Sequence, residues 1–312
     1  MVNPGTPTHY ILNGGLGDVI AASPVVKYAI DNFHNDGKYL VSTVPAYRDL
    51  LWFVPDDHFN SIFERYEFKE EYRHARIFPL GVHDVPKSNL SKVASYNLIN
   101  KVLRDEDYEY PPYPKQIDVS KYNVDFSRSV IISVGFRSPV RKWNNDILRK
   151  LTEYIVQKDH IPVLVGTSKE PFDPNSPLVS YKQGDEAKVL DVRDITTCVN
   201  LVDKTNLLDL IGIFQQSKCL IGYDGGPIHM AGLTDIPIIC AYTYVNPDYR
   251  MFVRRGKLGW NMYPVTVGKE KCRFCYTDWH LFNYRFDDCW TGTLECGDYK
   301  LEQFTDHLDK IL

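Results

Sequence analysis

Residues 221–233 read "IGYDGGPIHMAGL" and combine a strand, a turn and a helix within a few positions. The apolar run that ends at Tyr223 is typical of a buried parallel strand. Two glycines then allow a tight turn, and Pro227 is tolerated in the first turn of a helix. We therefore predict a strand–turn–helix unit that places Asp224 and His229 at the carboxyl end of a strand.

The same alternation extends on both sides of this stretch. Strands are predicted over 128–135, 161–167, 218–224 and 237–243, and helices over 145–158 and 206–217. In the first half of the chain, strands are expected near 9–12, 38–44 and 74–80, and helices after 15 and over 46–54. Strands that alternate with helices indicate a doubly wound parallel sheet, so the fold class is α/β with two Rossmann-like halves.

A proline-rich stretch, "YEYPPYPKQIDVS" at 108–120, separates the two halves. We predict an N-terminal domain over 1–125 and a C-terminal domain over 126–298. The second domain includes a cysteine-rich segment, 269–298. The last helix, 299–312, is a candidate to pack back on the first domain. Ligands of such sheets bind outside the carboxyl ends of the strands, which places a site in the cleft between the domains.

The composition is that of an ordered globular protein, with 44% hydrophobic and 13% aromatic residues in 312. No apolar run is long enough to span a bilayer, and the first residues lack the pattern of a signal peptide. We therefore expect a cytoplasmic protein without membrane insertion. The composition does not predict an oligomeric state.

The charge is unevenly distributed along the chain. The whole chain carries −4, whereas residues 250–286 contain eight Lys and Arg against Glu270 and Asp278, a balance of +6. Such a segment is either a solvated face or a contact surface for a polyanion or a phosphate group.

A glycine-rich turn, "NGGLGDV" at 13–19, follows the first predicted strand. Gly15 and Gly17 let the backbone approach a ligand, and amides at the start of the following helix can bind an anion or a sugar oxygen. Asp18 is a candidate general base for a substrate hydroxyl; the alternative is an acid that favours the helix dipole. The turn lacks the third glycine of the dinucleotide fingerprint, which disfavours a nicotinamide cofactor.

Two further clusters of polar residues follow predicted strands. The stretch "SVGFRSPVRKWNN" at 133–145 holds Arg137, Ser138, Arg141 and Lys142, which form either a diphosphate-binding loop or a basic surface loop. In the opening stretch, the first helical amides and His229 suit a phosphate, and Asp224 can orient His229 or cap the helix. The alternative is a capped helix with a buried histidine.

Four cysteines near the C-terminus have the spacing of a metal site. The pattern is Cys272-x2-Cys275-x13-Cys289-x6-Cys296. Four thiolates that include a tight C-x2-C pair can bind zinc or iron tetrahedrally, and a metal held entirely by protein ligands would be structural. Free thiols or disulfides are the alternatives.

These motifs together resemble the heptosyltransferase-like glycosyltransferases of family 9. The resemblance rests on "GGLGDVIAASP" at 14–24, "VRKWNN" at 140–145 and "DGGPIHMAG" at 224–232, and extends to the residues before the last motif. It implies the GT-B fold, in which two Rossmann-like domains face a deep cleft. It also implies an inverting transfer of a sugar from a nucleotide-diphosphate sugar, with no metal or other cofactor in the chemistry.

The resemblance also implies roles for individual residues. Asp18 would deprotonate the acceptor hydroxyl, and Arg141 or Lys142 would bind the diphosphate. The phosphates and the leaving sugar would be held by Asp224, Gly225, Gly226 and His229. Gly225 departs from the family pattern, because a Ser or Thr usually occupies this position. The cysteine segment resembles an iron-binding finger of the related autotransporter heptosyltransferases.

Three functions remain open on the sequence. The acceptor is a cell-envelope glycan of the lipopolysaccharide type, as is usual in the family, or a hydroxymethylated base in DNA, as in phage glycosyltransferases of the same architecture. The third function is a nucleotide-sugar-binding protein without catalytic activity.

Overall fold

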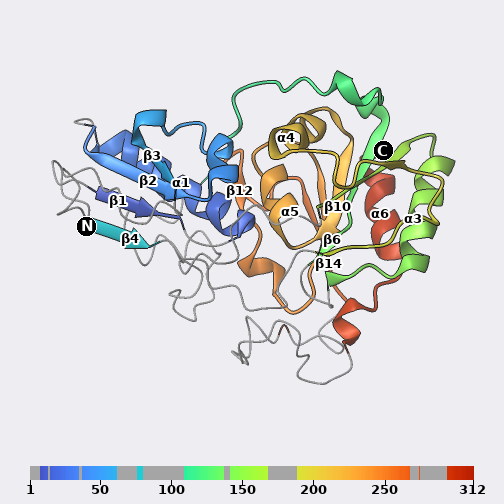
Figure 1. Cartoon of the computed structure of the whole chain (residues 1–312). Coiled ribbons are helices and arrows are strands. Elements are labelled where there is room, and N and C mark those ends of the chain that lie inside the picture. Colours follow the sequence, from blue (N-terminus) through green and yellow to red (C-terminus); the bar gives the residue numbers. More distant parts are fainter. Residues whose placement is uncertain are drawn as a thin grey trace.

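The computed structural model describes residues 8–12, 15–34, 37–61, 76–79, 109–136, 141–167, 188–267, 274 and 294–312. Figure 1 shows two α/β halves side by side, with the green segment that follows Glu109 passing from one to the other. Each half contains a parallel sheet, as predicted from the alternation of strands and helices. In the described residues, no helix combines the length and the apolar character needed to cross a membrane.

The first half is built on a small sheet with strand order β3-β2-β1-β4. The strands are β1 (Thr8–Ile11), β2 (Tyr39–Thr43), β3 (Phe59–Ser61) and β4 (Arg76–Pro79). Helix α1 (Leu16–Phe33) follows β1 and buries one apolar face, which includes Val19, Val25 and Val26. Every strand pair of this sheet is parallel, as expected for strands joined by crossover connections.

The second half has a larger sheet, again with all strands parallel and with the order β14-β11-β10-β5-β7-β9. The strands are β5 (Ser129–Ser133), β7 (Ile161–Val165), β9 (Val199–Asn200), β10 (Cys219–Tyr223), β11 (Ile238–Ala241) and β14 (Met262–Val265). After β5, the next strands β7 and β9 are added on one side of it. The chain then crosses to the other side of β5, where β10, β11 and β14 follow. The strand order therefore reverses between β5 and β10.

Helices cover both faces of the second sheet. They are α3 (Asn145–Gln157), α4 (Leu207–Gln216), α5 (Gly226–Ala231) and α6 (Glu302–Ile311). Side chains at their N-termini explain where two of them begin: Asn144 Oδ1 accepts from the Asp146 amide, and Asn206 and Asp209 exchange hydrogen bonds across the first turn of α4. Short antiparallel pairs, β6 (Gly135–Phe136) with β8 (Lys188–Val189) and β12 (Val253–Arg254) with β13 (Lys257–Leu258), complete this half.

Two elements differ from their sequence-based expectations. The helix predicted over 46–54 is a short 3-10 helix at Pro45–Leu50, which ends before Pro55, buries Tyr47 and Leu50 and contacts α4 and α1. Helix α6 packs against α3 and β14 through Phe304 and Leu308, in the core of the second half. The apolar side chains of α6 therefore pack on the second half, and not on the first half as expected from the sequence.

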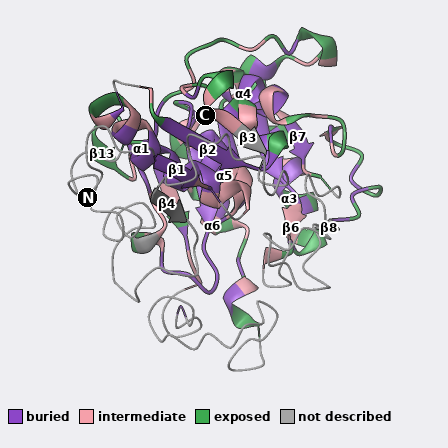
Figure 2. Cartoon of the chain, turned by 60° about the vertical axis from the view of Figure 1, so that its left-hand side comes forward, coloured by how far each residue is buried: buried purple, intermediate pink, exposed green. Residues whose placement is uncertain are grey.

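The hydrophobic core is not divided in the same way as the two sheets. One cluster of buried residues joins the first sheet, α1, α4, α5 and one face of the second sheet, and another fills the face covered by α3 and α6. Figure 2 shows the buried residues running through the strands and helices α1 and α5. Helices α1 and α5 contact each other directly, so the two glycine-containing turns predicted from the sequence meet at this contact.

Candidate functional site

The site lies where the strand order of the second sheet reverses. Asp224 directly follows β10, and Arg141 lies in the connection that follows β5 and β6. In open parallel sheets the carboxyl ends of the two strands at this reversal leave a crevice where ligands bind. The topology thus brings together two motifs that the sequence places far apart.

Asp224 is the centre of a buried cluster of charges. An Arg141 nitrogen lies 3.2 Å from Asp224 Oδ2, Arg250 Nε lies 4.0 Å from the same oxygen, and His229 Nε2 lies 3.7 Å from Oδ1. Burial alone raises the pKa of the Asp224 carboxyl. The contact with His229 and the charges of Arg141 and Arg250 outweigh burial and hold this pKa far below its usual range. Asp224 is therefore a carboxylate at neutral pH.

In the structure the two neighbouring cations of the "VRKWNN" stretch, Arg141 and Lys142, point to different places. Arg141 points to Asp224 and stacks on the ring of Tyr244, with 4.9 Å between its guanidinium carbon and the ring centroid. Lys142 is exposed and lines a different hollow of about 420 Å³, together with Trp143, Asn144, Asn145, Leu294, Gly297 and Asp298. Of the two cations proposed for the diphosphate, Arg141 is the one beside Asp224.

His229 is held on both sides of its ring. The Tyr110 hydroxyl lies 2.7 Å from His229 Nδ1, while Nε2 faces Asp224. Tyr110 itself stacks on Phe252 with ring centroids 4.4 Å apart. Burial raises the pKa of Tyr110, and the nearby carboxylates of Asp224 and Asp18 raise it further against the opposite effect of Arg250. The phenol therefore stays protonated. Because the Asp224 carboxylate only accepts hydrogen bonds, we assign the imidazole proton to Nε2, which faces it, and the phenol then donates to Nδ1.

The start of α1 lies against the same histidine. A Cβ atom on Gly17 would be 2.8 Å from His229 Cδ2, and one on Gly226 would be 2.9 Å from Leu16 Cδ2. Each glycine thus permits a close approach of the opposite helix. Asp18 sits in the first turn of α1, where its Oδ2 accepts from the Gly15 amide at 3.0 Å. The helix-terminal role that the sequence suggested for Asp18 is present, and the same contact holds its carboxylate beside the Asp224 cluster.

Gly225 has room for a side chain. Its backbone is extended, with φ 178°, and a Cβ atom would meet only Tyr223 O, at 3.6 Å. The close contacts that exclude a side chain are thus at Gly17 and Gly226. Gly225 stands where the family pattern has a hydroxyl residue, and sterics do not require a glycine there.

Several predicted site residues lie outside the described residues: Arg137, Ser138, Cys272, Cys275 and Cys289. Cys296, the last member of the predicted metal cluster, is buried in a 3-10 turn (Glu295–Gly297). Among the residues that the structure describes, no group of His, Cys, Asp or Glu side chains has the arrangement of a metal site.

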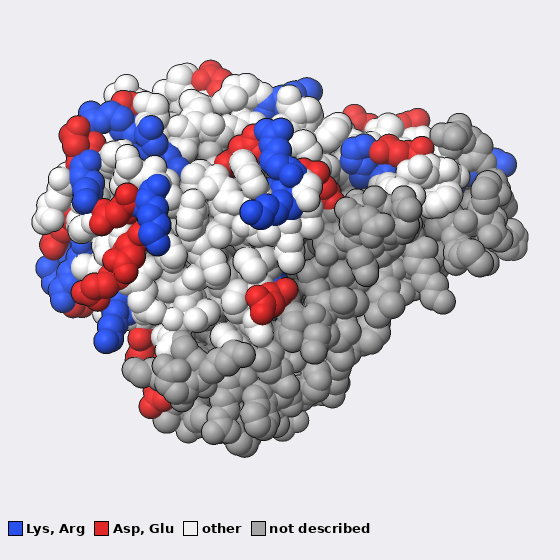
Figure 3. Space-filling view, turned by 180° about the vertical axis from the view of Figure 1, so that it is seen from behind, with Lys and Arg blue, Asp and Glu red and all other residues white. Residues whose placement is uncertain are grey.

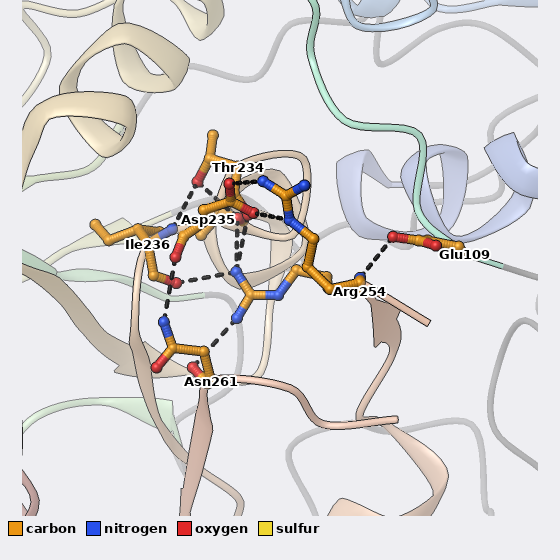
Figure 4. A network of polar contacts seen from close by, with 8 residues as sticks. Glu109, Thr234, Asp235, Ile236, Arg254 and Asn261 are labelled. Carbon is orange, nitrogen blue, oxygen red and sulfur yellow. Dashed lines mark hydrogen bonds and ion pairs between the residues drawn. The ribbon is translucent and has the colours of Figure 1, made fainter. Parts of the chain in front are cut away.

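The basic segment 250–286 does not form one surface in its described part. Arg254 is buried and donates to the carbonyls of Thr234, Ile236, Trp260 and Asn261, so that it ties the turn after α5 to β12 and the start of β14 (Figure 4). Arg255 pairs with Asp235 on the surface. On the face shown in Figure 3, basic and acidic side chains lie beside one another over much of the described surface. These residues of the segment therefore have different roles.

Two residues of the cluster were not predicted as site residues from the sequence. Tyr110 belongs to the proline-rich connection, and its contact with His229 spans 119 positions of the chain. Arg250 was visible only as one of the cations in the basic segment. Neither residue stands in a recognisable motif, so only the fold brings them to Asp224.

Comparisons with known proteins agree with this architecture. Residues 65–251 match the model of a family described as "Glycosyltransferase family 9 (heptosyltransferase)". Lipooligosaccharide heptosyltransferase 2 of Haemophilus influenzae is 24% identical over 111 residues, and lipopolysaccharide heptosyltransferase 2 of Salmonella typhimurium is 22% identical over the same length. Each alignment covers 36% of this chain, but only 30% and 29% of the respective relatives.

Solved structures show the same fold over the whole chain. The iron-containing dodecameric glycosyltransferase TibC of enterotoxigenic E. coli is 14% identical, with a TM-score of 0.71 that covers all of this chain and 77% of TibC. A family 9 glycosyl transferase of Veillonella parvula is 11% identical, with a TM-score of 0.61 and coverage of 100% and 98%. The fold is therefore GT-B, as expected.

Proposed function

Because the chain belongs to glycosyltransferase family 9, we propose that it transfers a sugar from a nucleoside-diphosphate sugar to an acceptor hydroxyl. The observation that carries this proposal is the convergence at one site of Asp224, Arg141 and His229 with the start of α1. In this proposal the half with the larger sheet, 126–298, binds the donor. The half over 1–125 presents the acceptor.

Arg141 binds the diphosphate of the donor in this reaction. Guanidinium groups form paired hydrogen bonds to phosphate oxygens, and a fixed cation stabilises the negative charge that grows on the leaving diphosphate. Asp224 holds Arg141 in place through the contact at 3.2 Å. His229, with its proton on Nε2, is a further donor to a phosphate or sugar oxygen. Gly225 and Gly226 bring the backbone of the turn close to the donor.

Asp18 is the general base. Its carboxylate removes the proton of the acceptor hydroxyl while that oxygen attacks the anomeric carbon, and the bond from this carbon to the diphosphate oxygen breaks. The proton ends on Asp18 and the electron pair of the broken bond on the diphosphate. A direct displacement of this kind inverts the anomeric carbon. No metal or other cofactor takes part.

The acceptor that we propose is a cell-envelope glycan of the lipopolysaccharide type. The heptosyltransferases of Haemophilus influenzae and Salmonella typhimurium support this choice, since their names state lipooligosaccharide and lipopolysaccharide. One structure of TibC holds ADP-D-beta-D-heptose, which makes ADP-heptose the first donor to test.

Donor binding is tested with a thermal-shift panel of nucleoside diphosphates and their sugars, ADP-heptose included. A ligand that binds only the folded chain stabilises it by about 3 kcal/mol at a concentration of 100 Kd, and this stabilisation raises Tm. The same donors are then offered with a deacylated lipopolysaccharide core or with hydroxymethylated duplex DNA as acceptor. Transfer to DNA alone would contradict the glycan acceptor, and no Tm shift with any donor would contradict the donor site.

The role of Asp18 is tested by Asp18→Asn, which keeps the size of the side chain. We expect kcat to fall by at least about 100-fold, the usual contribution of a general base, with donor binding retained. Asp31→Asn is the matched control, because Asp31 lies on the same helix and pairs with Lys27 on the surface. Wild-type turnover by Asp18→Asn would show that Asp18 is not the base, whereas donor binding by the wild type without transfer to any acceptor would support the non-catalytic function.

We also propose that Cys272, Cys275, Cys289 and Cys296 hold a structural zinc or iron ion. Their spacing supports this, and TibC is described as iron-containing. The measurement is the metal content of the purified protein by plasma mass spectrometry. Cys272→Ser should abolish a stoichiometric metal, and Cys219→Ser, at a buried cysteine of β10, should leave it unchanged.

A further inference from the structure

Arg250 differs from the other described cations of the basic segment. Arg254 binds backbone carbonyls inside the fold, and Arg255 pairs with Asp235 on the surface. Of these three arginines, Arg250 is the one that lies within ion-pair distance of Asp224. Its side chain is 12% exposed, compared with 62% for Arg255, so it belongs to the interior of the site.

A short rigid turn positions Arg250. After β11 the chain forms a 3-10 helix at Pro247–Tyr249, which is capped by Asn246 Oδ1 accepting from the Asp248 amide at 3.0 Å. The Arg250 amide then donates to Pro247 O at 2.9 Å. Strand β11 is the neighbour of β10, so this turn lies at the same edge of the sheet as Asp224. Arg250 therefore reaches the crevice from the side opposite to Arg141.

The two arginines converge on one oxygen atom. Arg141 and Arg250 both lie against Asp224 Oδ2, at 3.2 Å and 4.0 Å, while His229 faces Oδ1. Two guanidinium groups thus stand against one carboxylate in a place with little access to water. Like charges repel strongly when they are desolvated, and an anion between them relieves the repulsion. Asp18 supplies the other nearby carboxylate, but it is held at the start of α1 by the Gly15 amide.

We propose that Arg250 is a second donor-binding residue, which binds the diphosphate group together with Arg141. A diphosphate has two phosphoryl groups and matches two guanidinium groups that meet at one carboxylate oxygen, each of which can form paired hydrogen bonds to phosphate oxygens. Asp224 contacts both arginines and holds their guanidinium groups at the site. This inference rests on the proposed function and adds a residue that stands outside the three motifs.

Calorimetric titration with inorganic pyrophosphate and with ADP tests this role. Arg250→Gln should weaken the binding of both ligands by at least about tenfold, because it removes one charged partner. Arg250→Lys keeps the charge but loses the paired geometry, so it should weaken binding less. Arg255→Gln is the matched control and should bind both ligands as the wild type does. Thermal unfolding of each variant checks the fold, and Arg250→Lys carries the test where the Gln variant does not fold.

The outcomes separate this inference from the proposed function. Wild-type affinity in both Arg250→Gln and Arg250→Lys would overturn the inference and leave the donor site intact. Failure of the wild type to bind pyrophosphate and ADP would contradict the donor site itself. A loss in Arg255→Gln equal to that in Arg250→Gln would show a general effect of positive charge and would also overturn a specific role for Arg250.

Discussion

At the scale of single residues, the site depends on side chains that hold other side chains. Tyr110 has no place in any sequence motif, yet its hydroxyl is a partner of His229 Nδ1 and holds the ring with Nε2 toward Asp224. Such a group does not need to touch the substrate to affect the reaction. It fixes the direction in which a donor hydrogen points, which is a large part of how preorganised sites act.

We expect Tyr110→Phe to keep the fold and lose activity. The ring still stacks on Phe252, but His229 Nδ1 loses its partner, at a cost of about 1–3 kcal/mol for a buried group. This corresponds to a fall in kcat/KM of about tenfold or more. Nitrogen-15 NMR of the imidazole should show that the proton is no longer confined to Nε2.

Tyr154→Phe is the control for this change. Tyr154 lies on α3, away from the site, and its hydroxyl donates to Asp309 at 2.6 Å. It should retain wild-type kcat/KM and the wild-type imidazole spectrum. Equal activity of Tyr110→Phe and the wild type would mean that His229 is oriented without this hydroxyl.

A second residue-scale effect concerns stability. His9 on β1 is 3% exposed, its Nε2 lies 2.7 Å from Ser42 Oγ, and burial lowers its pKa to about 4. In the unfolded chain this histidine binds a proton below about pH 6.5, whereas in the folded chain it does so only near pH 4. The unfolded state therefore gains protons first as the pH falls, and the folded state loses about 3 kcal/mol of stability across this window.

The measurement is urea unfolding of His9→Gln and the wild type between pH 7.5 and 4.5. The variant should be less stable at pH 7.5 but should lose less stability as the pH falls. His160→Gln, at a half-buried histidine next to β7, is measured as the comparison variant. Parallel curves for His9→Gln and the wild type would contradict the buried neutral state.

At the scale of elements, the contact between α1 and α5 is the part of the fold that the sequence did not predict. The longer strands and helices follow from apolar runs and from periodicity. The strands β3, β8, β12, β13 and β14 were not predicted, and the helix expected over 46–54 is a 3-10 helix at Pro45–Leu50. Glycines in a turn indicate that other atoms approach the backbone closely, but they do not indicate which residue supplies those atoms. Here the close neighbours are the side chains of the opposite helix, His229 and Leu16.

We expect Gly17→Ala to destabilise the protein although alanine favours helices. Its Cβ would lie 2.8 Å from His229, a ring that Tyr110 and Asp224 already hold in place, and overpacking of this kind costs about 1–3 kcal/mol. Gly225→Ala is the matched control, since its Cβ has 3.6 Å to the nearest atom. Thermal unfolding compares the two variants, and equal Tm values would mean that α1 can move away from α5 without cost.

At the scale of the whole molecule, two sheets share a continuous apolar core. The sequence suggests two domains and a boundary at the proline-rich connection, because composition and periodicity report on neighbours along the chain. They carry no information on contacts such as that between Tyr110 and His229. For the same reason, Arg250 was counted as a cation but was not predicted as a site residue. Asp224 and His229 were predicted as site residues because they lie in one motif.

The pair of glycines at the start of α1 and α5 has a consequence for chimeric proteins. Gly17 makes room for a residue of the second half, and Gly226 makes room for a residue of the first. An exchange of one half with that of a relative would therefore bring a new side chain against an old one at both positions. Such hybrids should fold only when Leu16, Gly17, Gly226 and His229 come from the same parent, so that recombination has to treat these distant positions as a single inherited unit.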